Sequence, residues 1–340
     1  MLKLISLLEE LNYNPQIISI SSMPVDQILD TIDNTEIISD TVILQNGDLW
    51  RYFDEEQDIF NHPTLSNKTV FLQTLGYTNK KYNNFHYRIS FPIFYFDRVI
   101  VPDKLPLANN LEYGFSWLAG RFGIDRAILG HSLYTENLLD KIIFSQASPS
   151  DSPCTIQRIE EDLADEYGGL SLPNWNAYKN LLPVIHNDDK TPWNSEINFF
   201  TTGIYKQTSH PAFKDAYCNI AVESACEEYP YERNINLPVI TEKSYKPFSS
   251  RQIPLLVGAR GHYAYLKDLG FEMMEDLLPS GYDDMHFLQK VDAVVSTVAK
   301  GLEFAKDFYF SHLPEIQHNY ELVNSDKVDN LILRRIKDII

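Results

Sequence analysis

The feature of this sequence that most constrains its fold is an alternation between short apolar runs and helical patterns. The runs have the length and composition of buried strands, and turn residues such as Asn46-Gly47 separate them. The apolar runs span residues 17–20, 41–44, 69–72, 98–101, 196–201, 217–222 and 253–257. Helical spacing of apolar residues lies between them, for example over 24–32, 262–269 and 285–304. This alternation predicts parallel sheets whose strands are joined by crossover helices.

The length of 340 residues is too great for one small domain and suits two of ordinary size. We therefore expect an α/β protein with two Rossmann-like domains that face each other across a cleft. A Pro- and Asn-rich linker at 102–110 divides an N-terminal acceptor-side domain, 1–110, from a C-terminal nucleotide-binding domain, 111–305. A helical tail, 306–340, is expected to return to the N-terminal domain. In such sheets ligands bind beyond the carboxyl ends of the strands.

Charge and cysteine content exclude several classes of protein. The 29 Lys and Arg residues against 47 Asp and Glu residues give a net charge of −18, which disfavours nucleic-acid binding by overall attraction. The three cysteines show no Cys-x-x-Cys spacing, so neither structural zinc nor a disulfide framework is expected, and the cytoplasm is the natural setting. Glu9 and Glu10 interrupt the apolar start, which indicates an amphipathic helix and not a signal peptide, and no run predicts a membrane span.

Several common motifs are missing from the sequence. There is no Gly-x-Gly-x-x-Gly for a dinucleotide, no Gly-x-x-x-x-Gly-Lys loop, no His-Glu-x-x-His and no Asp-x-Asp. The absent Asp-x-Asp argues against a diphosphate that is clamped through a metal ion. Gly130-His-Ser-Leu-Tyr134 lacks the second glycine of a hydrolase elbow, so we interpret Ser132 as an ordinary helix residue.

The segment 237–257 carries the strongest functional signal. It predicts a strand, Thr241 as an N-cap, a short helix that begins with Glu242 and Lys243, and a second buried strand. A helix N-terminus offers free N–H groups and the positive end of the helix dipole, which suit a phosphate. The positive charge of Lys243 is unfavourable at this end of the dipole unless Lys243 binds an anion, which favours a role in phosphate binding. The alternative interpretation of Lys243 is a solvated lysine on an exposed turn.

Two blocks of this sequence resemble a set of glycosyltransferases found in bacteriophages and bacteria. The first comprises Thr241-Glu-Lys-Ser-Tyr-Lys-Pro247, Pro254-Leu-Leu-Val-Gly258, 265–271 and Gly281-Tyr-Asp283, and its Thr-Glu-Lys element is also similar to that of bacterial fucosyltransferases. The second, weaker block lies in 115–145, where Arg121 and Arg126 fall on two arginines of the family. The resemblance implies a GT-B-like enzyme that transfers a sugar from a nucleotide-sugar donor without a metal ion.

The resemblance also implies roles for individual residues. Lys243 would neutralise the diphosphate, Glu242 would bind the ribose or the sugar, and Arg126 would complete the phosphate clamp. The further donor-binding candidates are Arg121, Glu223, Thr241 and Arg260. Two alternatives stay open: a surface salt bridge for Arg126, and for Glu223 membership of the acidic surface run that includes Glu227 and Glu228.

Other residues near these motifs have simpler expected roles. Asp283 is expected to cap the helix that follows it, and His262 to start a helix. The general base should come from the N-terminal half, where Asp48 and Asp97 are the main candidates. Asp54, Glu55 and His62 are further possibilities that the sequence does not separate.

The sequence does not determine the acceptor, and it also allows a second, non-catalytic function. The acceptor is expected to be a hydroxyl of a glycan or of a modified nucleobase. The basic, aromatic run 79–88, with Lys80, Lys81 and Arg88, could form a rim for nucleic acid, or a β-hairpin edge that lysines protect from aggregation. Departures from the family pattern at 118–120 and 279–281 favour a rival, a degenerate binding or scaffold protein that has lost catalysis.

Overall fold

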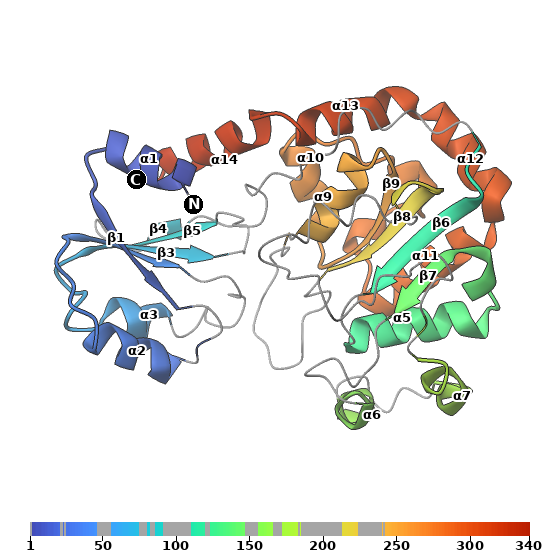
Figure 1. The fold of residues 1–340 in the computed structure, drawn as a ribbon, viewed down its shortest axis with the longest axis horizontal. Helices are drawn as coiled ribbons and strands as arrows, with labels where there is room; N and C mark the ends of the chain where they lie inside the picture. The colour runs from blue at the N-terminus through green and yellow to red at the C-terminus, as the bar shows by residue number, and fades with distance from the viewer. Residues whose placement is uncertain are drawn as a thin grey trace. The chain divides into compact units, whose positions relative to one another are not determined.

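The computed structural model of the chain forms two compact units, each an α/β structure around its own sheet (Figure 1). The structure describes residues 2–20, 23, 25–45, 56–74, 80–81, 86–90, 110–119, 123–146, 156–165, 172–182, 184, 213–223, 240 and 242–340. Unit 1 comprises residues 1–98, 237–241 and 326–340, and unit 2 comprises 99–236 and 242–325. The expected C-terminal tail is therefore divided between the two units at residues 325 and 326.

Unit 1 contains a sheet of order β1-β2-β3-β5-β4, in which β4 alone runs antiparallel to its neighbour. Its strands are β1 (Pro15–Ser19), β2 (Thr41–Gln45), β3 (Thr69–Thr74), β4 (Lys80–Lys81) and β5 (His86–Ser90). Its helices are α1 (Leu2–Glu10), α2 (Val25–Asp33), α3 (Glu56–Phe60) and α14 (Lys327–Lys337). β4 is an edge strand of this sheet, and its Lys80 and Lys81 lie in register with Arg88 and Tyr87 of β5.

Most residues on both faces of the central strands β2 and β3 are buried, as parallel strands require, whereas Ile17 and Ser19 of β1 are exposed. Val42 and Leu44 of β2 pack with Ile28 of α2 and Ile59 of α3. On the adjacent strand Phe71 makes ring contacts with Tyr13 and Tyr87, and α1 packs against both β1 and α14. Because side chains alternate along a strand, this pattern leaves no polar face on the central strands.

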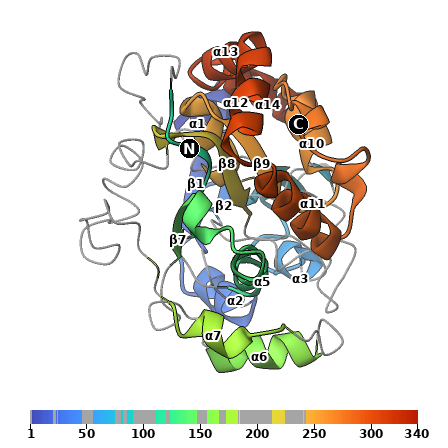
Figure 2. The ribbon, with the colours of Figure 1, turned by 90° about the vertical axis from the view of Figure 1, so that its right-hand side faces the viewer.

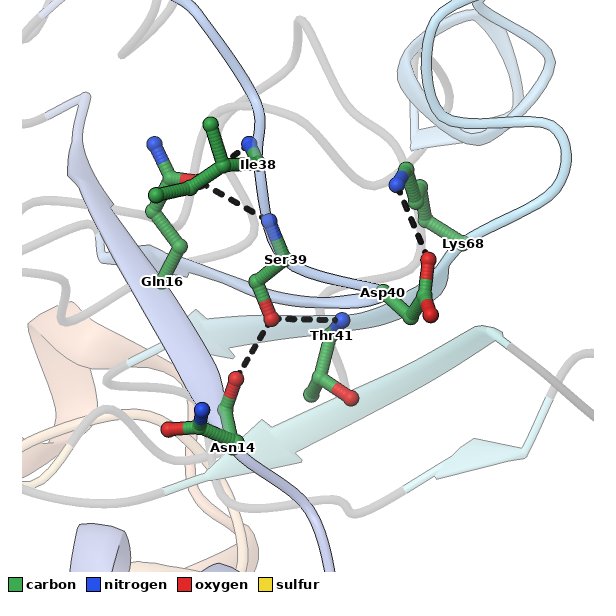
Figure 3. Close-up of polar contacts among 7 residues, drawn as sticks. All are labelled: Asn14, Gln16, Ile38, Ser39, Asp40, Thr41 and Lys68. Carbon is green, nitrogen blue, oxygen red and sulfur yellow. Dashed lines mark hydrogen bonds and ion pairs between the residues drawn. The ribbon is translucent and has the colours of Figure 1, made fainter.

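A polar network closes the amino ends of these strands, where Pro15, Thr41 and Thr69 lie in register (Figure 3). The side-chain oxygen of Gln16 accepts hydrogen bonds from the backbone N–H groups of Ile38 (3.0 Å) and Ser39 (3.4 Å). The Ser39 hydroxyl donates to the carbonyl of Asn14 (2.5 Å) and accepts from the N–H of Thr41 (3.1 Å). Lys68 pairs with Asp40 at 3.1 Å beside this group of residues, which we call the amino-edge network.

Unit 2 contains an all-parallel sheet of order β7-β6-β8-β9. Its strands are β6 (Tyr113–Ala119), β7 (Ile143–Gln146), β8 (Ala216–Val222) and β9 (Ile253–Val257). Its helices are α5 (Ile124–Thr135), α6 (Ile156–Asp165), α7 (Trp175–Lys179), α9 (Glu242–Ser249), α10 (His262–Asp268), α11 (Phe287–Ala299), α12 (Gly301–Ser311) and α13 (Leu313–Val323). Since the chain leaves β6 toward β7 and later continues from β8 to β9 in the opposite direction, a topological switch point lies between β6 and β8.

Helices cover the sheet of unit 2 in two layers. Right-handed crossovers place α5, which joins β6 to β7, and α9, which joins β8 to β9, on opposite faces. Helices α5 and α11 pack side by side (Figure 2), while α13 packs against α9, and α12 against β6 and β8. Every residue of β8 and β9 is consequently buried, and burial raises the pKa of the Cys218 thiol at the centre of β8.

Most of the elements predicted in the described part of the chain are confirmed, with one correction. Ser132 lies within α5 and donates to the carbonyl of Ile128, as an ordinary helix residue does. The single helix predicted over 285–304 is wrong. The structure has two helices there, α11 and α12, because Gly301 adopts a left-handed φ of 83° that interrupts the helix.

Candidate functional site

The candidate site lies at the carboxyl edge of the sheet of unit 2, beside the switch point. Arg126 stands in the first turn of α5, the helix that follows β6. Its Nη2 donates to the carbonyl of Val222, the last residue of β8, at 3.5 Å. The guanidinium therefore spans the place where strand order reverses, which is where ligands bind in sheets of this kind.

Glu223 follows β8 directly, as the sequence predicts, but it is buried. Its N–H extends the ladder by donating to the carbonyl of Val257 (2.9 Å). Its side chain is 1% exposed, and its Oε1 accepts a hydrogen bond from the hydroxyl of Ser244 (2.5 Å). The alternative that placed Glu223 in an acidic surface run is therefore wrong.

The hydroxyl of Ser244 has a second partner in His262, the first residue of α10. The distance from Ser244 Oγ to His262 Nε2 is 2.9 Å, and both residues are buried. Burial penalises the charged imidazolium and lowers the pKa of His262 to about 4, while the nearby Glu223 and Asp283 carboxylates act in the opposite direction. We call Glu223, Ser244 and His262 the carboxyl-edge cluster.

The other predicted donor-binding residues in the described part of the chain lie on α9 and in the loop after β9. Glu242 and Lys243 begin α9, so Lys243 occupies the first helical turn, immediately before Ser244, and is half-buried. Arg260 is exposed, between the end of β9 and the start of α10. Two cations and the cluster therefore belong to segments that adjoin the carboxyl ends of β8 and β9.

Asp283 corrects another expectation. Its carboxylate accepts hydrogen bonds from the N–H groups of Tyr263 (3.0 Å) and Ala264 (2.9 Å), so it caps α10 and not the helix that follows it. The start of α11 is closed separately, because the N–H of His286 donates to the side chain of Gln289 (3.1 Å). The amino end of α10 is consequently occupied by a protein carboxylate and offers these two N–H groups to no phosphate.

Lys290 and Ser244 are polar residues of this region that sequence reasoning missed. Lys290 is 1% exposed, and its Nζ donates to the carbonyls of Gly258 (3.0 Å) and Ala259 (3.3 Å) after β9. A signal for it existed, since Lys290 falls on the apolar stripe of its helix with Phe287, Val291 and Val294. For Ser244 the only signal was its place next to Lys243.

The remaining predicted site residues fall elsewhere. Asp48, Asp54, Glu55, Asp97, Arg121 and Thr241 lie outside the described residues. His62, in unit 1, contacts Asp33, with 3.4 Å between its Nε2 and the carboxylate Oδ1. Of the candidates, the structure thus brings Arg126 and Glu223 to one strand end, with Lys243 beside the cluster residue Ser244.

Within the described residues, no group of three or more His, Cys, Asp or Glu side chains is arranged to hold a metal ion. None of the helices in that part of the chain combines the length and the hydropathy of a bilayer span. Compared with known protein families, curated proteins and solved structures, the chain shows no significant match. Its function must therefore be inferred from the site itself.

Proposed function

We propose that this chain is a glycosyltransferase that takes a sugar from a nucleotide-sugar donor, with its two α/β units arranged in a GT-B-like manner. One observation carries the proposal. The two blocks that resemble glycosyltransferases are separated by about a hundred residues, yet Arg126 of one contacts the end of β8, and the other is tied to the same end through Ser244 and Glu223. Convergence of distant motif residues on a carboxyl edge is typical of a nucleotide site.

The chemistry assigned to this edge is stabilisation of the leaving group. During transfer the bond between the sugar and the diphosphate breaks, a bond to the acceptor oxygen forms, and the acceptor proton passes to a base. Lys243 and Arg126 neutralise the negative charge that develops on the diphosphate, as fixed cations can do in place of a metal ion. We place the acceptor, a glycan or a modified nucleobase, and the general base on the side of unit 1.

A second candidate function is a binding module without catalysis. It is favoured by the use that this structure makes of two acidic residues. Glu223 is 1% exposed and bound by Ser244, and Asp283 caps α10, so both carboxylates are engaged within the protein. A protein that retained nucleotide binding without transfer would fit this pattern.

A thermal-shift titration with UDP, GDP, CMP and dTDP, and with the corresponding sugar nucleotides, tests the proposal. Wild-type protein should be stabilised by one of them, by a few degrees at a hundred-fold excess over Kd, with and without EDTA. Lys243→Ala should lose this stabilisation. Lys306→Ala is the matched control, because Lys306 is also half-buried on a helix but follows Ala305, which packs against Gly114 near the amino end of β6.

The outcomes separate the candidates. Stabilisation by a nucleotide, together with release of free sugar or transfer to an acceptor, supports the transferase. Stabilisation without turnover of the matching sugar nucleotide, across glycan and hydroxymethylated-base acceptors, supports the binding module. Absence of any shift from cooperatively melting wild-type protein contradicts both.

A further inference from the structure

The carboxyl-edge cluster joins three segments that are far apart in the sequence. Glu223 ends β8, Ser244 lies in the first turn of α9, and His262 begins α10. Ser244 Oγ lies 2.5 Å from Glu223 Oε1 and 2.9 Å from His262 Nε2, and the three residues are 1%, 0% and 1% exposed. A fully buried hydroxyl with two partners at these distances has a single geometry that satisfies both.

Counting protons fixes the direction of each hydrogen bond. Ser244 has one hydroxyl proton, and the Ser244 hydroxyl donates it to Oε1 of Glu223. The contact to His262 must then be donated by Nε2–H, so neutral His262 carries its proton on Nε2. His262 Nδ1 is left as a bare acceptor, and within the described part of the chain it has no hydrogen-bond partner.

The backbone around His262 is shaped to hold the ring in this orientation. A Cβ on Gly258 would lie 2.3 Å from His262 Nδ1, so only glycine leaves room for the imidazole. Lys290 fixes the carbonyls of Gly258 and Ala259, and Asp283 holds the N–H groups that follow His262. The ring is therefore a rigid support for the Ser244 hydroxyl.

Burial decides how such a cluster can act. With 1% or less of each side chain exposed, none of the three residues can touch a ligand unless the site reorganises. Their effect must pass through neighbours that are accessible. The nearest of these along the chain is Lys243, which precedes Ser244 in the same helical turn and is half-buried.

Resting on the transferase function proposed above, we propose that Ser244 and His262 are positioning residues. Through Glu223 they lock the first turn of α9 onto the end of β8 and so hold Lys243 where it meets the donor diphosphate. A cation displaced by an ångström or more loses much of its interaction with a phosphate, since charge-assisted hydrogen bonds need close geometry. Breaking the lock should therefore weaken diphosphate binding although no ligand contact has been removed.

The experiment compares two variants of the same shape. Ser244→Thr and Ser244→Val fill equal volumes, but only threonine keeps the hydroxyl, so their difference isolates the hydrogen bonds from the packing. Ser249→Val is the matched control, because Ser249 is also fully buried on α9 but donates only to Lys246 of its own helix (2.9 Å). The dissociation constant of the nucleoside diphosphate that stabilises wild type is measured by calorimetry well below each melting temperature.

We expect Ser244→Val to raise that dissociation constant about ten-fold over Ser244→Thr, and Ser249→Val to stay within about two-fold of wild type. His262→Leu should act like Ser244→Val, and His262→Gln, which keeps an N–H donor, should recover part of the affinity. Equal affinities for Ser244→Thr and Ser244→Val, whatever their melting temperatures, would overturn the positioning role and leave the transferase standing. If none of the four nucleotides shifts the wild type, the proposed function is overturned, and the positioning role with it.

Discussion

The amino-edge network of unit 1 and the carboxyl-edge cluster of unit 2 both join neighbouring segments through polar contacts, but they differ in how far solvent reaches them. Both tie neighbouring segments together at one end of a set of parallel strands. The network does so at the protein surface, where Gln16 and Ser39 bind backbone groups and Asp40 is fully exposed (Figure 3). The cluster does so through side chains alone, and each of its members is buried.

Solvent access makes the difference between these regions consequential. If a hydrogen bond of the amino-edge network is lost, water replaces it, and the net effect on stability is small. A donor or acceptor that loses its partner in the buried carboxyl-edge cluster is out of reach of water. The full desolvation penalty of that group is therefore subtracted from the stability of the folded protein. Buried polar groups of this kind are expected where function requires a fixed geometry. In parallel sheets the functional site lies at the carboxyl edge.

The largest effect is expected from Gly258→Ala. The new Cβ would lie 2.3 Å from His262 Nδ1 and would push the ring off Ser244, so we expect a loss of about 3 kcal/mol in the free energy of unfolding. Gly123→Ala is the control, because nothing lies within 4 Å of a Cβ there. Urea unfolding followed by tryptophan fluorescence measures both. Equal midpoints for the two variants would mean that the cluster is not tightly packed.

Acidification should weaken unit 2 through His262. The folded pKa of His262, about 4, lies below its usual 6.5, so between these values the unfolded chain binds more protons and stability falls as the pH falls. We expect a loss of about 2 kcal/mol from pH 7 to pH 4.5. Glu223, Asp283 and Lys290 are the charged groups near the ring.

Comparison with His262→Gln tests whether protonation of the His262 imidazole causes this loss of stability in acid. The variant has no imidazole to protonate, so its stability should fall less over the same range, when both proteins are measured by urea unfolding at matched ionic strength. Parallel curves for the two proteins would show that other groups cause the loss.

A smaller effect is expected in the amino-edge network. Ser39→Ala removes the hydroxyl that donates to the carbonyl of Asn14 and accepts from the N–H of Thr41. Thr41 itself is buried, but Asn14 and Asp40, which adjoin these two backbone groups, are exposed, so water can replace the hydroxyl. We expect a loss of about 1 kcal/mol, measured by urea unfolding. A loss as large as that of Gly258→Ala would erase the distinction between the two regions.

The smallest effect is expected from Lys68→Ala. Its partner Asp40 is fully exposed, and an ion pair of this kind gains little because water and salt screen it. The melting temperature should change by less than about 1 °C, and the change should vanish in 0.5 M NaCl. A larger, salt-independent change would point to packing by the lysine stem.

Much of the fold could be predicted from the sequence, because strand and helix signals are local. The apolar runs within β1, β2, β3, β8 and β9 predict parallel strands, of which β8 and β9 are buried throughout, and the sequence also predicts the position of Glu223 at the end of β8. The exception at Gly301 shows the limit of periodicity: apolar spacing continues through the glycine, while its left-handed backbone ends one helix and starts another.

The partners of polar side chains could not be predicted, because they depend on contacts between distant segments. Asp283 is adjacent to one helix in sequence but caps α10, which precedes it by about twenty residues. The hydrogen-bond partners of Ser244 and Lys290 lie on distant segments, at the end of β8 and in the loop after β9, and are recognised only in the folded structure. Local patterns predict where a residue sits along an element, and tertiary structure decides what it touches.

The contact between α1 and α14 has a consequence for the order of folding. These two helices of unit 1 are separated by more than three hundred residues, which include all of unit 2. During synthesis α1 and the strands beside it emerge long before residue 327 is made. The apolar surface that α14 covers therefore stays exposed while unit 2 is synthesised. We expect unit 2 to fold first, and the closing of α14 onto α1 to be the slow final step that seals unit 1.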